Sequence, residues 1–208
     1  SGAFLSKATA VEGNGATIER SLNAPPFRIF DVQVPAGVVI RDLTIRNGNS
    51  TTNGGAIYSN TDLTLENVTL EGNSAPRGGA LTQAFGRLVI DNGRLFDNHA
   101  TDLGGAIFLQ SGTMDITNTI FGQNRADSGN GAAVFVGGAV TGDARITNST
   151  ITDNAGNTGA AITTWGALDL RNTIVANHKV GLAVGGTSRV TDDHNLFANT
   201  TIDVRELS

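Results

Sequence analysis

The chain has 208 residues, a formal net charge of −5 at pH 7 and no cysteine. The negative charge disfavours nucleic acids and anionic membranes as partners, and the lack of cysteine excludes disulfides, thiol catalysis and thiolate metal sites. No run of about 18 apolar residues is available to span a bilayer, and residues 1–15 lack the basic start and apolar stretch of a signal peptide.

The first 36 residues are the least regular part of the chain. Gly13-Asn14-Gly15 predicts a turn into a strand, Pro25-Pro26 interrupts the chain, and residues 27–34 alternate between apolar and polar side chains. We predict one domain, in which residues 1–36 form an N-terminal cap and a first coil. Residues 37–196 are then expected to form regular coils, and residues 197–208 a C-terminal cap.

A Gly-Gly-Ala-aliphatic signature recurs along the rest of the chain. Its copies, some of them degenerate, occupy residues 54–57, 78–81, 104–107, 131–134, 159–162 and 181–184. Their starting positions differ by 22 to 28 residues. A repeat of about this length predicts a solenoid, in which each unit buries its apolar face against its neighbours.

Within each repeat, short apolar alternations predict strands, and asparagines predict bends. No segment shows a helical period. One bend column comprises Asp42, Asn67, Asn92, Asn118, Asn148 and Asn172, and a second comprises Asn73, Asn98, Asn124, Asn154 and Asn177. Asparagine tolerates a left-handed backbone and its amide bonds to stacked amides, so we interpret both columns as structural. The chain is thus predicted to be all-β, a single right-handed parallel β-helix of about seven or eight coils.

The strand that follows the signature is expected to have one inward and one outward face. The predicted inward column is Ile57, Leu81, Ile107, Val134, Ile162 and Val184. The predicted outward columns are Ala56, Ala80, Ala106, Ala133, Ala161 and Ala183, and Tyr58, Thr82, Phe108, Phe135, Thr163 and Gly185. Exposed aromatic side chains on a flat face commonly serve a partner. We therefore predict Tyr58, Phe108, Phe135 and the nearby Trp165 as ligand-binding residues, unless a loop or the tail covers them.

Charged residues near the C-terminal end are the catalytic candidates: Arg171, Arg189, Asp192, Asp193 and His194. A glycosidase needs two carboxyl groups about 5 to 9.5 Å apart. Consecutive strand residues point to opposite faces, so a polar bend or cap is the alternative interpretation. Separately, Asp115, Arg145 and Asp169 share one outward position in successive coils and predict stacked ion pairs.

Metal ligands are sparse. His178 and His194 belong to consecutive coils but lack a certain third ligand. A row of Asp97, Asp102, Asp127 and Asp153 is irregularly spaced and matches no strict calcium motif. We predict no metal and no cofactor, with Ca²⁺ as the alternative.

The repeated Gly-Gly-Ala-[Ile/Leu/Val], followed by [Phe/Leu/Ile]-x-x-Asn, resembles bacterial pectin-lyase-like β-helix surface proteins and the repeats of polymorphic membrane proteins, which are adhesins. The resemblance covers roughly residues 27–199, although a strict Phe-x-x-Asn occurs only at 121–124. It implies a prokaryotic protein that is secreted or at the cell surface and binds a glycan or a surface protein.

Three functions stay open. The first is a non-catalytic, adhesin-like module that binds a glycan or protein through the aromatic face. The second is a carbohydrate-active enzyme, a polysaccharide lyase or glycosidase, and the third is a self-associating structural segment. We expect neither nucleic acid as a partner nor insertion into a membrane.

Overall fold

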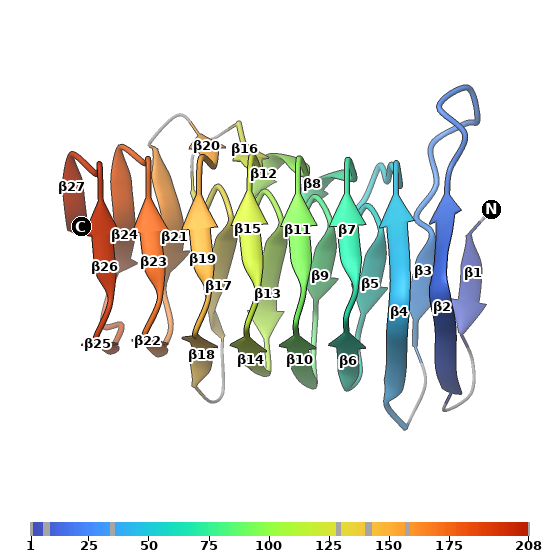
Figure 1. Cartoon of the computed structure of the whole chain (residues 1–208), viewed down its shortest axis with the longest axis horizontal. Helices are drawn as coiled ribbons and strands as arrows, with labels where there is room; N and C mark the ends of the chain where they lie inside the picture. Colours follow the sequence, from blue (N-terminus) through green and yellow to red (C-terminus); the bar gives the residue numbers. More distant parts are fainter. Residues whose placement is uncertain are drawn as a thin grey trace.

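The computed structural model describes residues 2–5, 9–33, 36–127, 130–139, 143–156 and 159–207. Its regular structure consists of β-strands, which stack as a right-handed parallel solenoid of about seven turns (Figure 1). The predicted fold class is confirmed. Within the described residues, no helix is long and apolar enough to cross a membrane.

Three sheets run along the axis. The nine-stranded sheet contains, in spatial order, β1 (Ala3–Leu5), β3 (Phe30–Val32), β5 (Ile57–Ser59), β9 (Leu81–Gln83), β13 (Ile107–Ser111), β17 (Val134–Ala139), β21 (Ala160–Thr164), β24 (Val180–Gly185) and β27 (Ile202–Leu207). The four-stranded sheet contains β8 (Ser74–Arg77), β12 (His99–Leu103), β16 (Arg125–Ala126) and β20 (Ala155–Gly156).

The 14-stranded sheet divides into two branches at its long strand β4 (Val38–Arg46), which also pairs with β2 (Thr9–Glu19). One branch contains β6 (Leu63–Glu66), β10 (Arg87–Asp91), β14 (Thr113–Thr117), β18 (Ala144–Thr147), β22 (Leu168–Arg171) and β25 (Val190–Asp193). The other contains β7 (Thr69–Glu71), β11 (Arg94–Phe96), β15 (Ile120–Gly122), β19 (Thr150–Thr152), β23 (Ile174–Ala176) and β26 (Leu196–Ala198).

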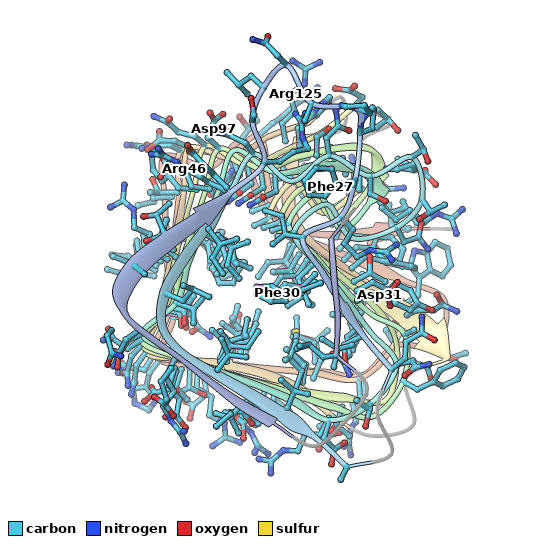
Figure 2. The ribbon with its side chains drawn as sticks, turned by 90° about the vertical axis from the view of Figure 1, so that its right-hand side faces the viewer. Phe27, Phe30, Asp31, Arg46, Asp97 and Arg125 are labelled. Atoms are coloured by element: carbon cyan, nitrogen blue, oxygen red, sulfur yellow. The ribbon has the colours of Figure 1, made fainter. Side chains whose placement is uncertain are left out.

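The core fills the inside of the tube. Viewed along the axis, Phe30 points inward while its neighbour Asp31 points outward (Figure 2). Ile107 and Val134 are paired in register and completely buried, as the repeat predicts. The cap predicted for residues 197–208 stays a prediction, and in the structure β27 pairs with β24.

Both glycines of the copy at residues 104–107 are required by the backbone. Gly104 has a φ of 64°, in the left-handed region that disfavours side chains. Gly105 lies so close to the next coil that a Cβ there would be 2.0 Å from the carbonyl oxygen of Ala132. The first glycine has a positive φ in the copies that begin at residues 54, 78, 104, 131 and 159, whereas the second is replaced by Ala132 and Ala160 in two of them.

The last copy of the signature lies two residues out of its predicted register. Ile162 pairs with Leu182, and Thr163 pairs with Ala183, whereas we expected Val184 and Gly185 in those positions. Leu182 is buried and Val184 only half-buried. Gly-Leu-Ala-Val offers an aliphatic side chain at both positions, so the pattern alone did not distinguish the two registers.

The first predicted bend column is confirmed. Asp42, Asn67, Asn92, Asn118, Asn148 and Asn172 all have φ values between 48° and 55°. Their side chains are exposed and bond along the axis in places, as where the Asn67 amide donates to Asp42 over 3.0 Å. We call this set the exposed column.

The second predicted column is confirmed in four coils and wrong in the last. Asn73, Asn98, Asn124 and Asn154 are buried, and each of the first three bonds to the next amide along the axis. Asn177 lies one residue earlier, has a φ of 62° and is exposed. The next buried position belongs instead to His178, whose ring nitrogens lie 3.0 Å from the carbonyl oxygen of Asn154 and 3.2 Å from that of Ile151. We call Asn73, Asn98, Asn124, Asn154 and His178 the buried ladder.

Candidate functional site

The predicted exposed strip of alanines does not exist. All six side chains are completely buried: Ala56, Ala80, Ala106, Ala133, Ala161 and Ala183. In the first four coils the strand begins only at the residue after the alanine. The period-two alternation therefore does not extend back to it, and its side chain joins the interior at the bend.

The predicted exposure of Phe108 and Phe135 is also wrong. They lie in register on the outer side of β13 and β17, but are only 5% and 7% exposed. Their ring centroids are 5.7 Å apart, and the Arg77 guanidinium lies 5.7 Å from the centroid of Phe108. Because these groups cover one another, neither phenyl ring offers an open face to a ligand.

Tyr58 differs from the two phenylalanines because it is only half-buried and borders a groove of about 650 Å³. The groove is lined by Arg28, Gln33, Thr51, Thr52, Asn53, Tyr58, Pro76, Arg77 and Asp102. It opens on the outer side of the nine-stranded sheet, near the N-terminal end of the solenoid.

Arg28 forms one wall of this groove and is held from several sides. Its guanidinium lies 4.8 Å from the Tyr58 ring centroid and donates to Asp31 over 2.7 Å. It also donates to the Thr52 hydroxyl over 2.9 Å and to the Asn53 carbonyl over 2.6 Å. On the other wall, Arg77 donates to Asp102 over 2.8 Å. The groove thus combines an aromatic ring with paired, planar polar side chains.

Trp165 lies elsewhere, in the bend between β21 and β22, and is 40% exposed. A Cβ at Gly185 would be 2.6 Å from two carbons of the indole. The ring therefore packs directly against the backbone of the next coil, and only a glycine leaves room for it there. The exposure of the residue keeps Trp165 as a candidate for ligand contact.

Two of the predicted catalytic residues, Arg171 and Arg189, are brought to one hollow of about 220 Å³ beside this bend. The hollow is lined by Asp143, Arg145, Ala167, Leu168, Asp169, Arg171, Arg189 and Thr191. The largely buried carboxylate of Asp169 accepts hydrogen bonds from Arg171 over 2.7 Å and Arg145 over 3.1 Å.

None of the other three catalytic candidates lines that hollow, although the hydrogen bond to Asp169 and the charge of Asp193, opposite Arg171 in the register, both raise the pKa of Arg171. In the register, Asp192 lies opposite Leu170 and Asp193 opposite Arg171, so consecutive carboxylates point to different sides. Asp192 accepts from Asn195 over 2.5 Å, while Asp193 pairs with His194 over 2.6 Å. The expected divergence of neighbouring strand residues is confirmed, and Asp192 and Asp193 form no carboxylate pair across a cleft.

The pKa shifts of Asp169 and Arg171 in the hollow favour their charged forms and therefore an ion pair. Burial alone would raise the pKa of Asp169, but the hydrogen bonds from Arg171 and Arg145 outweigh it and lower that pKa. The hydrogen bond to Asp169 also raises the pKa of Arg171. A raised pKa makes Arg171 a poorer general base, and a lowered pKa makes Asp169 a poorer general acid.

The predicted ion-pair column forms in part. Arg145 pairs with Asp169 as expected, whereas Asp115 pairs with Arg87 over 3.2 Å. Among the described residues, no group of three or more metal-ligating side chains forms. In the aspartate row, Asp102 pairs with Arg77, and the Asp127 carboxylate contacts His99 over 2.9 Å and Arg125.

Sequence reasoning did not identify Arg28 and Arg77 as parts of a site. Neither belongs to a repeated column, and only the fold shows that both guanidinium groups lie over aromatic rings. Arg145 and Asp169 were predicted as an ion pair, but their place beside Arg189 depends on the register of β25, which the pattern does not reveal.

No curated protein and no solved structure matches the chain. A family model described as the right-handed beta helix region matches residues 6–202, nearly the whole chain. Together with the stacked parallel sheets, this match shows that the chain belongs to the right-handed β-helix family.

Proposed function

We propose that the chain is a non-catalytic binding module that takes a glycan in the groove at Tyr58. The observation that carries the proposal is the setting of Tyr58, a half-buried aromatic ring at the edge of an open groove of about 650 Å³. Small-ligand sites combine apolar surface with a few placed polar groups. A sugar has both apolar ring faces and hydroxyl groups, so it matches this combination.

The charges in the groove favour a neutral glycan. Arg28 is paired with Asp31, and Arg77 is paired with Asp102, so both positive groups already have a carboxylate partner. Paired guanidinium and carboxylate groups still offer directed donors and acceptors to hydroxyl groups. We also propose that the module acts outside the cell or on its surface, in a prokaryote, as the repeat resemblance implies.

The enzyme alternative gains no support from the pKa directions. The raised pKa of Arg171 disfavours it as the general base of a lyase, and the lowered pKa of Asp169 disfavours it as the general acid of a glycosidase at neutral pH. Assays for reducing ends and for unsaturated products on polysaccharides test this directly. Turnover of any of these polymers contradicts the non-catalytic proposal.

Binding is tested by a glycan array, followed by calorimetric titration of each oligosaccharide that binds. We expect Tyr58→Ala to lower the affinity about tenfold or more, which corresponds to about 1.4 kcal/mol. Tyr58→Phe retains the ring and is expected to retain most of the affinity. Phe85, an exposed aromatic residue outside the groove, supplies the matched control Phe85→Ala. Equal losses in the Tyr58→Ala and Phe85→Ala variants contradict the assignment to this groove.

Self-association is a second candidate, favoured by one apolar row. Ile120, Ile174 and Leu196 lie at one register position on the outer face of β15, β23 and β26 and are exposed, and Thr150 of β19 lies between Ile120 and Ile174. Exposed apolar side chains gathered in one row are typical of contact surfaces. Sedimentation velocity over a range of concentrations tests this candidate. A monomer that stays monomeric at the highest concentration rules it out, and Ile174→Lys is expected to abolish any dimer.

A further inference from the structure

We propose that Trp165 and the arginine-lined hollow beside it form a second binding site, separate from the Tyr58 groove, for a carboxylated sugar. The site lies on the last coils of the solenoid, whereas the Tyr58 groove lies on the first ones. The proposal does not depend on the glycan binding proposed for Tyr58.

The hollow exists because the small residue Ala167 lies between Asp143 and Arg189 in successive coils. The register pairs Ala144 with Leu168 and Leu168 with Val190. The preceding residues Asp143, Ala167 and Arg189 therefore occupy successive coils at one position. Ala167 leaves a space between Asp143 and Arg189. The Arg189 side chain crosses this space, and its terminal nitrogen lies 3.4 Å from a carboxylate oxygen of Asp143.

The hollow is rich in hydrogen-bond donors that are not engaged by these ion pairs. Arg145 and Arg171 both donate to Asp169 through Nε, so the terminal amino groups of both side chains lie outside those two hydrogen bonds. The side chain of Arg189 is 78% exposed, and its contact with Asp143 is long. The two carboxylates of the lining are already paired, and the charge of Asp193 acts on Arg171 from outside the lining, so the groups left to a ligand are mainly the donors of Arg145 and Arg189.

A hollow lined by hydrogen-bond donors favours a ligand that carries several hydrogen-bond acceptors close together, such as a carboxylate. Guanidinium groups match a carboxylate through two parallel hydrogen bonds, and such charge-assisted bonds are about twice as strong as neutral ones. Asp169 fixes the orientation of both Arg145 and Arg171 before a ligand arrives. Because the two side chains are held in place, less conformational entropy is lost on binding.

Trp165 indicates what carries the carboxylate. It precedes Ala167 by two residues, so their Cα atoms are at most about 7 Å apart. Its indole packs on Gly185, and the residue as a whole is 40% exposed. A flat apolar ring face stacked on the indole, with a carboxylate reaching the arginines, describes a sugar acid better than a free inorganic anion.

The composition provides a specific reporter, because Trp165 is the only tryptophan in the chain. We would titrate the whole chain with cellobiouronic acid, a disaccharide of glucuronic acid and glucose, and with cellobiose as its neutral match. Sialyllactose and lactose form a second matched pair with a different acidic sugar. Tryptophan fluorescence and calorimetry are recorded in chloride buffer. We expect at least one acid to change the fluorescence and to bind about tenfold or more tightly than its neutral match.

Three variants localise the effect. Arg189→Ala removes an exposed guanidinium and is expected to weaken binding of the acid about tenfold while leaving the neutral sugar unchanged. Gly185→Ala places a methyl group where the indole now packs, and is expected to weaken both members of a pair by displacing Trp165. Arg94→Ala, which removes an arginine that lies over Phe96 on another strand branch, is the matched control and is expected to change neither affinity.

Several outcomes overturn this proposal. One is an equal affinity for the acidic and the neutral sugar in both pairs. Another is an affinity of Arg189→Ala for the acidic sugar that equals that of the wild type. A third is a change of tryptophan fluorescence with sodium acetate alone that equals the change with the acidic sugar. Tyr58→Ala separates the two sites. Loss of the tryptophan response in that variant overturns the second site, whereas loss of neutral-glycan binding with an intact response leaves it standing and supports the Tyr58 groove.

Discussion

The two asparagine columns use the same residue for different physical reasons. In the buried ladder, the Asn98 amide accepts from the backbone and side chain of Asn73 and donates to the Leu70 carbonyl and to Asn124. In the exposed column, Asn92 has a φ of 54° and its side chain donates to Asn67 in solvent. Burial makes the amide indispensable in one column, while backbone conformation selects asparagine in the other.

The largest effect is expected from removing one amide of the buried ladder. Asn98→Ala leaves the Asn73 backbone N–H and the Leu70 carbonyl without their partner, at a position sealed from water. Each buried polar group left unsatisfied costs about 1 to 3 kcal/mol, so we expect a loss of about 3 to 5 kcal/mol. Urea unfolding followed by circular dichroism measures it.

Neighbouring amides of the ladder are expected to be coupled. Asn98 and Asn124 share a hydrogen bond of 2.9 Å, so the cost of replacing both should be less than the sum of the single costs. A double-mutant cycle with Asn124→Ala measures this coupling. A cost below about 1 kcal/mol for Asn98→Ala would contradict the role of the ladder.

His178 breaks the pattern of the ladder and is predicted to make stability depend on pH. Burial lowers the pKa of His178 below 6.5, despite opposing contacts with the Asn154 and Ile151 carbonyls and the charge of Asp153. The folded state therefore binds a proton less readily than the unfolded state. Stability from this residue is fully present above the unfolded pKa and is lost as pH falls through the folded pKa.

The measurement compares the wild type with His178→Asn at about pH 8, 6 and 5. In the wild type, the Asn154 amide donates to the Thr152 carbonyl. An asparagine at position 178 would offer it a side-chain oxygen, as the next asparagine of the buried ladder does in the other coils. We expect the variant to lose less stability on acidification. The lowered pKa values of Asp91, Asp127 and Asp169 act below about pH 4 and do not interfere. A wild type that gains stability between about pH 7 and 5 contradicts the prediction, and means that the two carbonyl contacts outweigh burial.

The regular part of the fold follows from the sequence, because period-two alternation and bend asparagines repeat in every coil. The irregular positions do not follow. Asn177 matched the buried column in residue type but lies one position early, and His178 gave no sign that it replaces an asparagine. In the first four coils the alanine matched an outward position only if the strand began before the bend, which it does not.

The sequence identified several individual residues of the candidate sites, but it did not predict which of them lie close together. Trp165, Arg171 and Arg189 were each singled out, yet their proximity depends on the register of β22 against β25. The exposure of an aromatic residue depends on long side chains from other coils. Arg77 covers Phe108, and no spacing rule in the repeat predicts which ring an arginine covers.

The smallest effect is expected in the exposed column, where the backbone rather than the amide is the reason for asparagine. Asn92→Ala forces a side chain with a β-carbon into the left-handed region, which costs about 1 kcal/mol. Asn92→Gly removes the same hydrogen bond to Asn67 but adopts that conformation freely, so its cost should be near zero. Urea unfolding of both variants separates the two contributions. Equal costs for alanine and glycine would show that the exposed amide stabilises the coil as the buried one does, and the contrast between the columns would disappear.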